Sequence, residues 1–124
     1  MTRARAIAGL IAGANFVISA AAHSFLGWKG LGSELAALRP PADLALGLQL
    51  GWHFGGVAML AFGIIVVLLC VKGMRGESVS VLPLMVIAIA YLVFGVWALV
   101  ASNFNLFFLI FIVPGLLLMF AAWA

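Results

Sequence analysis

The stretch from Leu44 to Val71 reads LALGLQLGWHFGGVAMLAFGIIVVLLCV and contains no aspartate, glutamate, lysine or arginine. A helix rises about 1.5 Å per residue, so about 20 apolar residues cross the hydrocarbon core of a bilayer, which is about 30 Å thick. This stretch is therefore long enough to cross a membrane as a helix. Helices are expected here because the backbone of an open sheet would leave its hydrogen-bonding groups unpaired in lipid.

Three further apolar stretches have a similar length, and short segments rich in charged and turn residues separate them. The four predicted spans are Ala6–Leu26, Leu44–Val71, Val79–Ala101 and Phe104–Trp123. No stretch shows the alternation of apolar and polar residues that is typical of a transmembrane barrel strand. We therefore expect an all-α membrane protein. Residues 1–124 should form a single integral-membrane domain, a four-transmembrane-helix bundle with short loops.

The composition of the whole chain supports this class. Hydrophobic residues make up 68% of the 124 residues and charged residues only 7%, whereas about 25% of the residues in an average soluble domain are charged. So few charges could not cover the surface of a soluble enzyme. A net charge of +3 is also too small to indicate a nucleic-acid-binding patch. We expect the lipid bilayer as a partner, and no nucleic acid.

The longest loop, residues 27–43, has a helical pattern of its own. Leu31, Leu35 and Leu38 recur at i, i+4 and i+7, and the pair Pro40-Pro41 follows them. Leucines at this spacing form one apolar face of a helix, and prolines end a helix. The pattern predicts a short helix that lies on the outer membrane surface.

The distribution of basic residues predicts the orientation of the chain. Four spans place both termini on one side of the membrane. That side would carry four basic residues, Arg3, Arg5, Lys72 and Arg75. The opposite side would carry two, Lys29 and Arg39. Because basic residues are enriched in cytoplasmic loops, both termini should be cytoplasmic. The composition is typical of a multi-pass protein of a bacterial inner membrane.

Glycines at helical spacing predict where the helices pack. Gly47, Gly51 and Gly55 recur every four residues in the second span, and Gly9 and Gly13 do so in the first. Small residues let helix backbones approach closely in lipid, where the hydrophobic effect does not drive helices together. The stripes predict packing within one bundle or contact with a second copy or another membrane protein.

Polar side chains inside the spans form the candidate site. They recur at four-residue spacing on two spans, and further polar and aromatic residues on the third span and after it fall near the same depth. The candidate pocket residues are Asn15, Ser19 and His23, then Gln49 and His53, then Trp97 and Asn103. His23 and His53 are each about 27–28 Å along their helices from the cytoplasmic charges. The two histidines should therefore be level with each other, just below the outer boundary of the membrane.

Three interpretations of these histidines are open. They could make structural hydrogen bonds to a neighbouring helix, or line a pocket for a small molecule or lipid headgroup. They could also bind a metal or haem, because two histidines on facing helices of a bundle are suitable haem ligands. Zinc would need further ligands beyond His23 and His53, since structural and catalytic zinc sites use three or four.

Missing motifs limit the function. All three acidic residues, Glu34, Asp43 and Glu77, lie in loops, so no embedded carboxylate indicates a proton-coupled exporter. No phosphate-binding loop or nucleophile–base pair is present, and no catalytic residue is assigned. We expect a non-enzymatic membrane subunit or binding protein that contacts other membrane-protein subunits or copies of itself. The alternative is a small membrane enzyme, or a haem- or metal-binding redox carrier, that uses His23 and His53.

Overall fold

The structure of the chain is a computed structural model that describes residues 1–123. The described residues are helical and include no strand, which confirms the predicted all-α class. The helices are α1 (Arg3–Ala21), the π-helical turn η1 (Ala22–Gly27), α2 (Trp28–Ala37), α3 (Ala42–Met74), α4 (Leu82–Ala101), the 3-10 turn η2 (Leu106–Phe108) and α5 (Leu109–Ala122).

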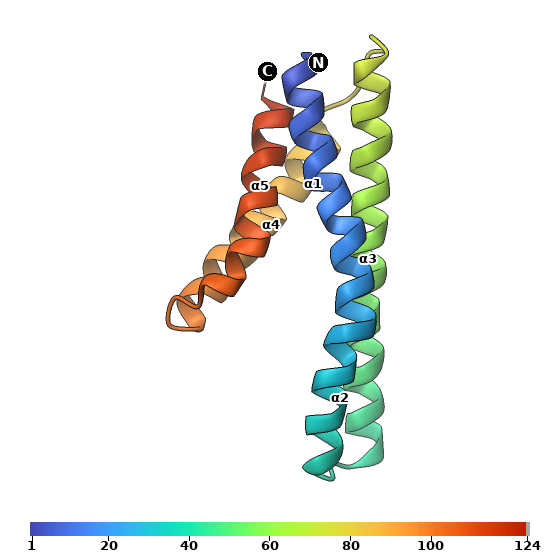
Figure 1. Cartoon of the computed structure of the whole chain (residues 1–124), viewed down its shortest axis with the longest axis vertical. Coiled ribbons are helices and arrows are strands. Elements are labelled where there is room, and N and C mark those ends of the chain that lie inside the picture. Colours follow the sequence, from blue (N-terminus) through green and yellow to red (C-terminus); the bar gives the residue numbers. More distant parts are fainter. Residues whose placement is uncertain (124) are drawn as a thin grey trace.

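These helices form two antiparallel hairpins of unequal length (Figure 1). In the long hairpin, α1, η1 and α2 run as one helix from Arg3 to Ala37 alongside α3. In the short hairpin, α4 packs on η2 and α5, and α5 also packs on α1. Both termini lie at the same end of the molecule as the α3–α4 connection.

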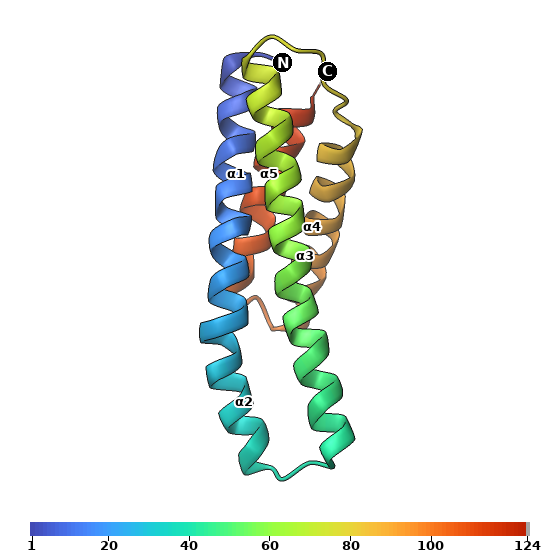
Figure 2. The same ribbon diagram turned by 90° about the vertical axis from the view of Figure 1, so that its right-hand side faces the viewer.

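The short helix predicted in the first loop is present as α2, but its placement differs from the prediction. It continues α1 through η1 instead of lying across the membrane surface (Figure 2). Nothing between Ala22 and Ala37 ends the helix, because the first proline comes only at position 40. The chain leaves the helix at Arg39, which has a φ of 49°, and the proline that follows disfavours right-handed helical geometry at this residue.

Three of the helices are long and apolar enough to cross a membrane: Arg3–Ala37, Ala42–Met74 and Leu82–Ala101. The residues of the fourth predicted span form a shorter apolar helical segment, Leu106–Ala122, which is not among these three helices and starts two residues later than predicted. At about 1.5 Å per residue, α3 is about 50 Å long and α4 about 30 Å. The long hairpin therefore extends well beyond the α4–α5 turn (Figure 1).

The two long helices meet along positions that alternate three and four residues apart. On α3 these positions include Ala45, Gln49, Trp52, Gly56, Met59, Gly63, Val66, Cys70 and Gly73, all of them buried or half-buried. On the facing helix they are Ala6, Gly9, Gly13, Phe16, Ala20, His23 and Gly27, again all buried or half-buried. This spacing averages 3.5 residues per turn, which is the repeat of a coiled-coil seam.

The buried core lies toward the end of the molecule that holds the termini. Gly13 and Gly63 face each other there: a Cβ atom added to Gly63 would lie 3.0 Å from the carbonyl oxygen of Gly13. The largest fully buried side chains are Phe16, Val66, Cys70, Leu84 and Leu118. This core joins the two hairpins at one end and leaves them free to diverge at the other.

Candidate functional site

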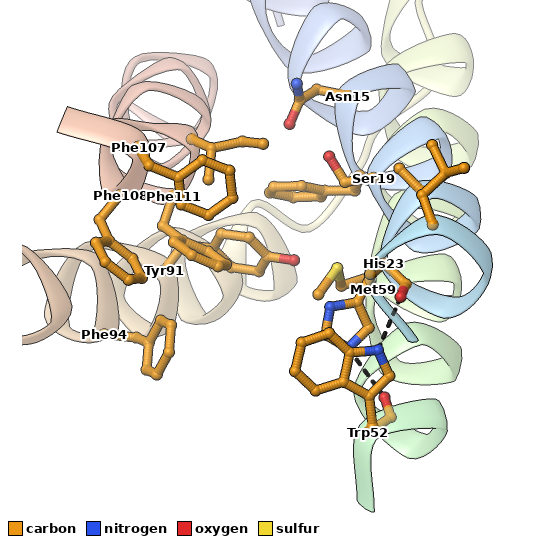
Figure 3. A pocket seen from close by; sticks show the side chains of 15 residues that line it. Asn15, Ser19, His23, Trp52, Met59, Tyr91, Phe94, Phe107, Phe108 and Phe111 are labelled. Atoms are coloured by element: carbon orange, nitrogen blue, oxygen red, sulfur yellow. Dashed lines mark hydrogen bonds between the residues drawn. The ribbon is translucent and has the colours of Figure 1, made fainter. Parts of the chain in front are cut away.

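The divergence of the two hairpins creates a crevice below the core. Its cavity volume is about 620 Å³, which is within the range of small-molecule sites, about 300–1,000 Å³. One wall is built by α1, η1 and α3, and the other by α4, η2 and α5 (Figure 3). The crevice therefore exists only because the short hairpin tilts away from the long one.

Apolar side chains line most of the crevice. Aromatic rings dominate the wall formed by the short hairpin, where Phe94 and Phe111 make an edge-to-face contact at 4.9 Å between ring centroids. The apolar lining residues are Phe16, Ala22, Leu26, Gly27, Met59, Phe94, Phe107, Phe108, Ile110 and Phe111. None of the 15 lining residues, all of which belong to the described chain, carries a permanent charge.

The polar residues Asn15, Ser19 and His23 enter the crevice from the first long helix. They lie four residues apart, so one face of α1 and η1 presents all three, and all three line the crevice. The Oδ1 atom of Asn15 is buried and has no hydrogen-bond partner among the described residues. The sequence therefore placed these three residues on one face, and the structure brings that face to the cavity.

Tyr91 brings a hydroxyl group from the opposite wall. The residue is only 9% exposed, and its ring packs on Phe16 at 4.1 Å between centroids. The hydroxyl points across the crevice toward the side of His23 and Met59 (Figure 3). It makes no hydrogen bond within residues 1–123. The residue is buried but its hydroxyl group faces the cavity, so this group is available to a ligand.

His23 and Trp52 hold the two long helices together at the edge of the crevice. The Nε2 atom of His23 lies 2.9 Å from the carbonyl oxygen of Trp52, and the Nε1 atom of Trp52 donates to the carbonyl oxygen of His23 at 2.8 Å. The two rings stack with 4.2 Å between centroids and 8° between planes. His23 lies within the π turn η1, and such turns frequently occur at functional sites.

This geometry determines which atoms of His23 face a ligand. A carbonyl oxygen only accepts hydrogen bonds, so Nε2 of His23 must carry the hydrogen in this contact. In the neutral ring Nδ1 then has a free lone pair. Figure 3 shows this second nitrogen on the crevice side of the ring. His23 therefore presents a hydrogen-bond acceptor to the cavity.

The other candidate residues lie outside the crevice lining. His53 is near Trp28, with 5.6 Å between ring centroids, and Gln49 lines a smaller cleft between α2 and α3. Trp97 is 63% exposed and touches the ring of Phe94. Asn103 lies in the α4–η2 turn with a φ of 55°. Successive residues of a helix point about 100° apart, so Trp52, and not His53, faces His23.

Some glycines of the predicted stripes pack against neighbouring helices and others do not. Gly9 lies against Cys70 and Ala121, Gly13 against Val66 and Val67, and Gly55 against His23. An added Cβ on Gly47 or Gly51 would meet no atom of the described chain within 4 Å. These two glycines lie on the side of α3 opposite the seam, because the seam recurs every 3.5 residues and the stripe every four.

Several crevice residues were not among the sequence candidates. Tyr91 is the only tyrosine of the chain, and an isolated tyrosine in an apolar helix carries no directional signal. Trp52 is a tryptophan near the end of a predicted span, and such residues are typical of the aromatic belt at a membrane boundary. The heptad spacing of Trp52, Gly56, Met59 and Gly63 was the available signal, and it would have placed Trp52 and Met59 on the inner face of α3.

The site has no obvious place for a protein-bound metal. Within the described residues, no group of three or more histidine, cysteine, aspartate or glutamate side chains is close enough to hold an ion. The geometry also gives no support to His23 and His53 as a haem-binding pair, because His23 uses Nε2 for Trp52 and His53 packs near Trp28. The arrangement is suited to holding an uncharged molecule.

Comparisons with protein-family models, with curated proteins and with solved structures find no match to this chain.

Proposed function

We propose that this protein is a non-enzymatic membrane binding protein that holds a mainly apolar, amphiphilic molecule in the crevice between its two hairpins. The observation that carries the proposal is the crevice itself. Its volume of about 620 Å³ is lined by apolar side chains together with four polar ones that point inward, Asn15, Ser19, His23 and Tyr91. Pockets for small molecules have this composition, with a few polar groups that orient the ligand.

The level of the site supports a ligand that enters from the membrane. Trp52 and His23 are amphipathic side chains, which favour the boundary between lipid and water. The crevice lies below the core and beside the α4–η2 turn, where α4 ends after about 30 Å. A molecule from the bilayer can reach this level without crossing water. We place the crevice in the outer half of the membrane.

The same proposal includes the orientation and location of the chain. Arg3, Arg5, Lys72 and Arg75 belong to the end that carries both termini (Figure 1). The positive-inside rule then puts that end in the cytoplasm and the α2–α3 connection outside. We propose a bacterial inner membrane as the location, on the basis of composition.

A pair of neighbouring alanines allows a direct test of the crevice. Ala21 and Ala22 are both exposed, but only Ala22 lines the cavity. We expect Ala22→Phe to fill the cavity and weaken binding of octadecan-1-ol at least tenfold, with Ala21→Phe as the matched control that binds normally. Native mass spectrometry from detergent micelles counts the bound molecules, and one per natural chain is expected. Equal binding by both variants would remove the crevice as the site.

A second role, lateral contact with another membrane-protein subunit or a second copy of the chain, is favoured by the outer part of α3. Leu44, Leu48 and Leu50 are 46–62% exposed there, and Gly47 and Gly51 have open space around them. In a Cys70→Ala background, Gly51→Cys should form a disulfide between copies in membranes if a second copy covers this face. If a different subunit covers it, a cross-linker at position 51 should give a heavier mixed product.

A further inference from the structure

The volume of the crevice limits the size of its ligand, and its hydrogen-bonding groups limit the chemistry of the ligand's polar end. His23 offers an acceptor, Nδ1, because Nε2 is used by the Trp52 carbonyl. The hydroxyl of Tyr91 projects into the same cavity and has no partner within the described residues. A phenol hydroxyl is a good donor. One wall therefore presents an acceptor and the other a donor.

A polar end that lies between the two walls is offered both of these groups. A hydroxyl can pair with both, because it donates one hydrogen bond and accepts others. A ketone, ester or ether oxygen accepts only, so it could pair with Tyr91 but would leave Nδ1 of His23 without a partner. An acceptor that a ligand covers without pairing loses its hydration, which costs free energy. The pair of groups thus distinguishes a hydroxyl from neutral oxygen groups that only accept hydrogen bonds.

A charged head group does not fit the same position. No lysine, arginine, aspartate or glutamate is among the residues that line the crevice in the described chain. A buried carboxylate, phosphate or ammonium needs an opposite charge or several strong hydrogen bonds to offset its lost hydration. The lining provides only neutral partners, and few of them. An anionic phospholipid head or a fatty-acid carboxylate is therefore disfavoured.

We infer that the ligand of this crevice is a neutral amphiphile whose hydroxyl group bridges Tyr91 and His23, accepting from the phenol and donating to Nδ1. This inference rests on the proposed binding function and specifies the ligand class. The apolar remainder of the molecule packs against the aromatic wall of Phe94, Phe107, Phe108 and Phe111. Asn15 lies eight residues from His23, about 12 Å along the helix, so it forms a separate polar point of the same cavity.

Two probes with the same chain test the hydroxyl requirement. Octadecan-1-ol can donate and accept, whereas octadecyl methyl ether only accepts. We expect the natural chain to bind the alcohol about three- to tenfold more tightly than the ether, which is the effect of one neutral hydrogen bond. Equal affinities would overturn the inference. They would leave the proposed function standing, because that function depends on the Ala22→Phe effect and not on this ratio.

Two substitutions then separate the donor from the acceptor. Tyr91→Phe removes only a hydroxyl that has no partner in the described chain, so folding should be retained. It should weaken the alcohol and the ether by the same factor, because both accept from Tyr91. His23→Phe keeps an aromatic ring beside Trp52 but removes Nδ1 together with the Nε2 hydrogen bond to Trp52. Loosening of this wall should weaken both probes, and loss of Nδ1 should weaken the alcohol further, so the ratio of affinities should come close to one.

Two further variants test where in the crevice the hydroxyl group of the ligand binds. Asn15→Leu removes another polar point of the cavity, and Gln49→Leu makes the same replacement outside it. Neither should change the alcohol-to-ether ratio. A ratio that falls to one in Asn15→Leu and persists in His23→Phe would contradict the assignment to His23. If His23→Phe does not fold, equal loss of both probes in Tyr91→Phe remains the required result, and an unchanged affinity for both would overturn the inference.

Discussion

His23 and Trp52 form a reciprocal contact in which each side chain hydrogen-bonds the backbone carbonyl of the other residue, at 2.9 and 2.8 Å. The two rings stack between these hydrogen bonds. The contact joins the two antiparallel helices of the long hairpin. It lies at the level where the short hairpin diverges from the long one. It therefore fixes one wall of the crevice and orients the free nitrogen of His23.

Loss of this contact should destabilise the long hairpin. Trp52→Phe removes the donor to the His23 carbonyl while it retains an aromatic ring, and we expect a loss of about 1–3 kcal/mol in the free energy of unfolding. Trp97→Phe is the control, because Trp97 is 63% exposed and donates no hydrogen bond within the described residues. Reversible unfolding in detergent, followed by circular dichroism, measures both variants. Equal stability of the two would show that the contact contributes nothing.

The reciprocal geometry also predicts coupling between the two residues. If His23→Phe and Trp52→Phe each break the same paired unit, the double variant should lose clearly less stability than the sum of the single losses. A double-mutant cycle on the same unfolding assay gives the coupling energy. Strict additivity would mean that the two hydrogen bonds act independently.

The glycines of α3 should differ strongly in their tolerance of a methyl group. A Cβ on Gly63 would lie 2.8 Å from Val17 Cγ2 and 3.0 Å from the Gly13 carbonyl oxygen, whereas one on Gly51 would meet nothing in the described chain. Gly63→Ala should cost about 1–3 kcal/mol, as overpacked sites do. Gly51→Ala should be neutral or stabilise by up to about 1 kcal/mol, because alanine favours helix. The reverse order in thermal unfolding would mean that the seam is misplaced.

The orientation can be tested with single cysteines in a Cys70→Ala background. Ser33 and Ser78 are both exposed and belong to opposite ends of the long hairpin. On intact cells an impermeant thiol reagent should label a cysteine at position 33 and leave one at position 78 unreacted until the cells are opened. Labelling at position 78 alone would put the termini outside and move the crevice to the cytoplasmic half.

The sequence predicted the helical class and most of the helix boundaries because apolar length, prolines and glycines act locally. It also placed Asn15, Ser19 and His23 on one face. It did not predict the partner of His23, because equal depth does not determine which way a side chain points around α3. His53 lies at the depth of His23, but Trp52 is the residue whose side chain points toward His23. Tyr91 could not be assigned, because the angle between the two hairpins is set by the packing of both.

The straight continuation of α1 into α2 was missed for a different reason. The sequence of residues 27–32 contains three glycines, which lowers helix propensity and favours a loop. The helix is supported at Gly27, which packs against the ring of Trp52 on α3. Tertiary contacts therefore outweighed local preference in this segment.

Photolabelling is the measurement that tests the crevice most directly. A diazirine analogue of octadecan-1-ol, activated in bilayers containing the protein, marks the residues that its apolar chain touches, and peptide mass spectrometry identifies them. We predict labelling concentrated on Met59, Phe94 and Phe111, which line the crevice, and its loss in Ala22→Phe but not in Ala21→Phe. Labelling spread evenly over the exposed outer residues Val57, Ile64 and Val93, unchanged by Ala22→Phe, would contradict a ligand held between the hairpins.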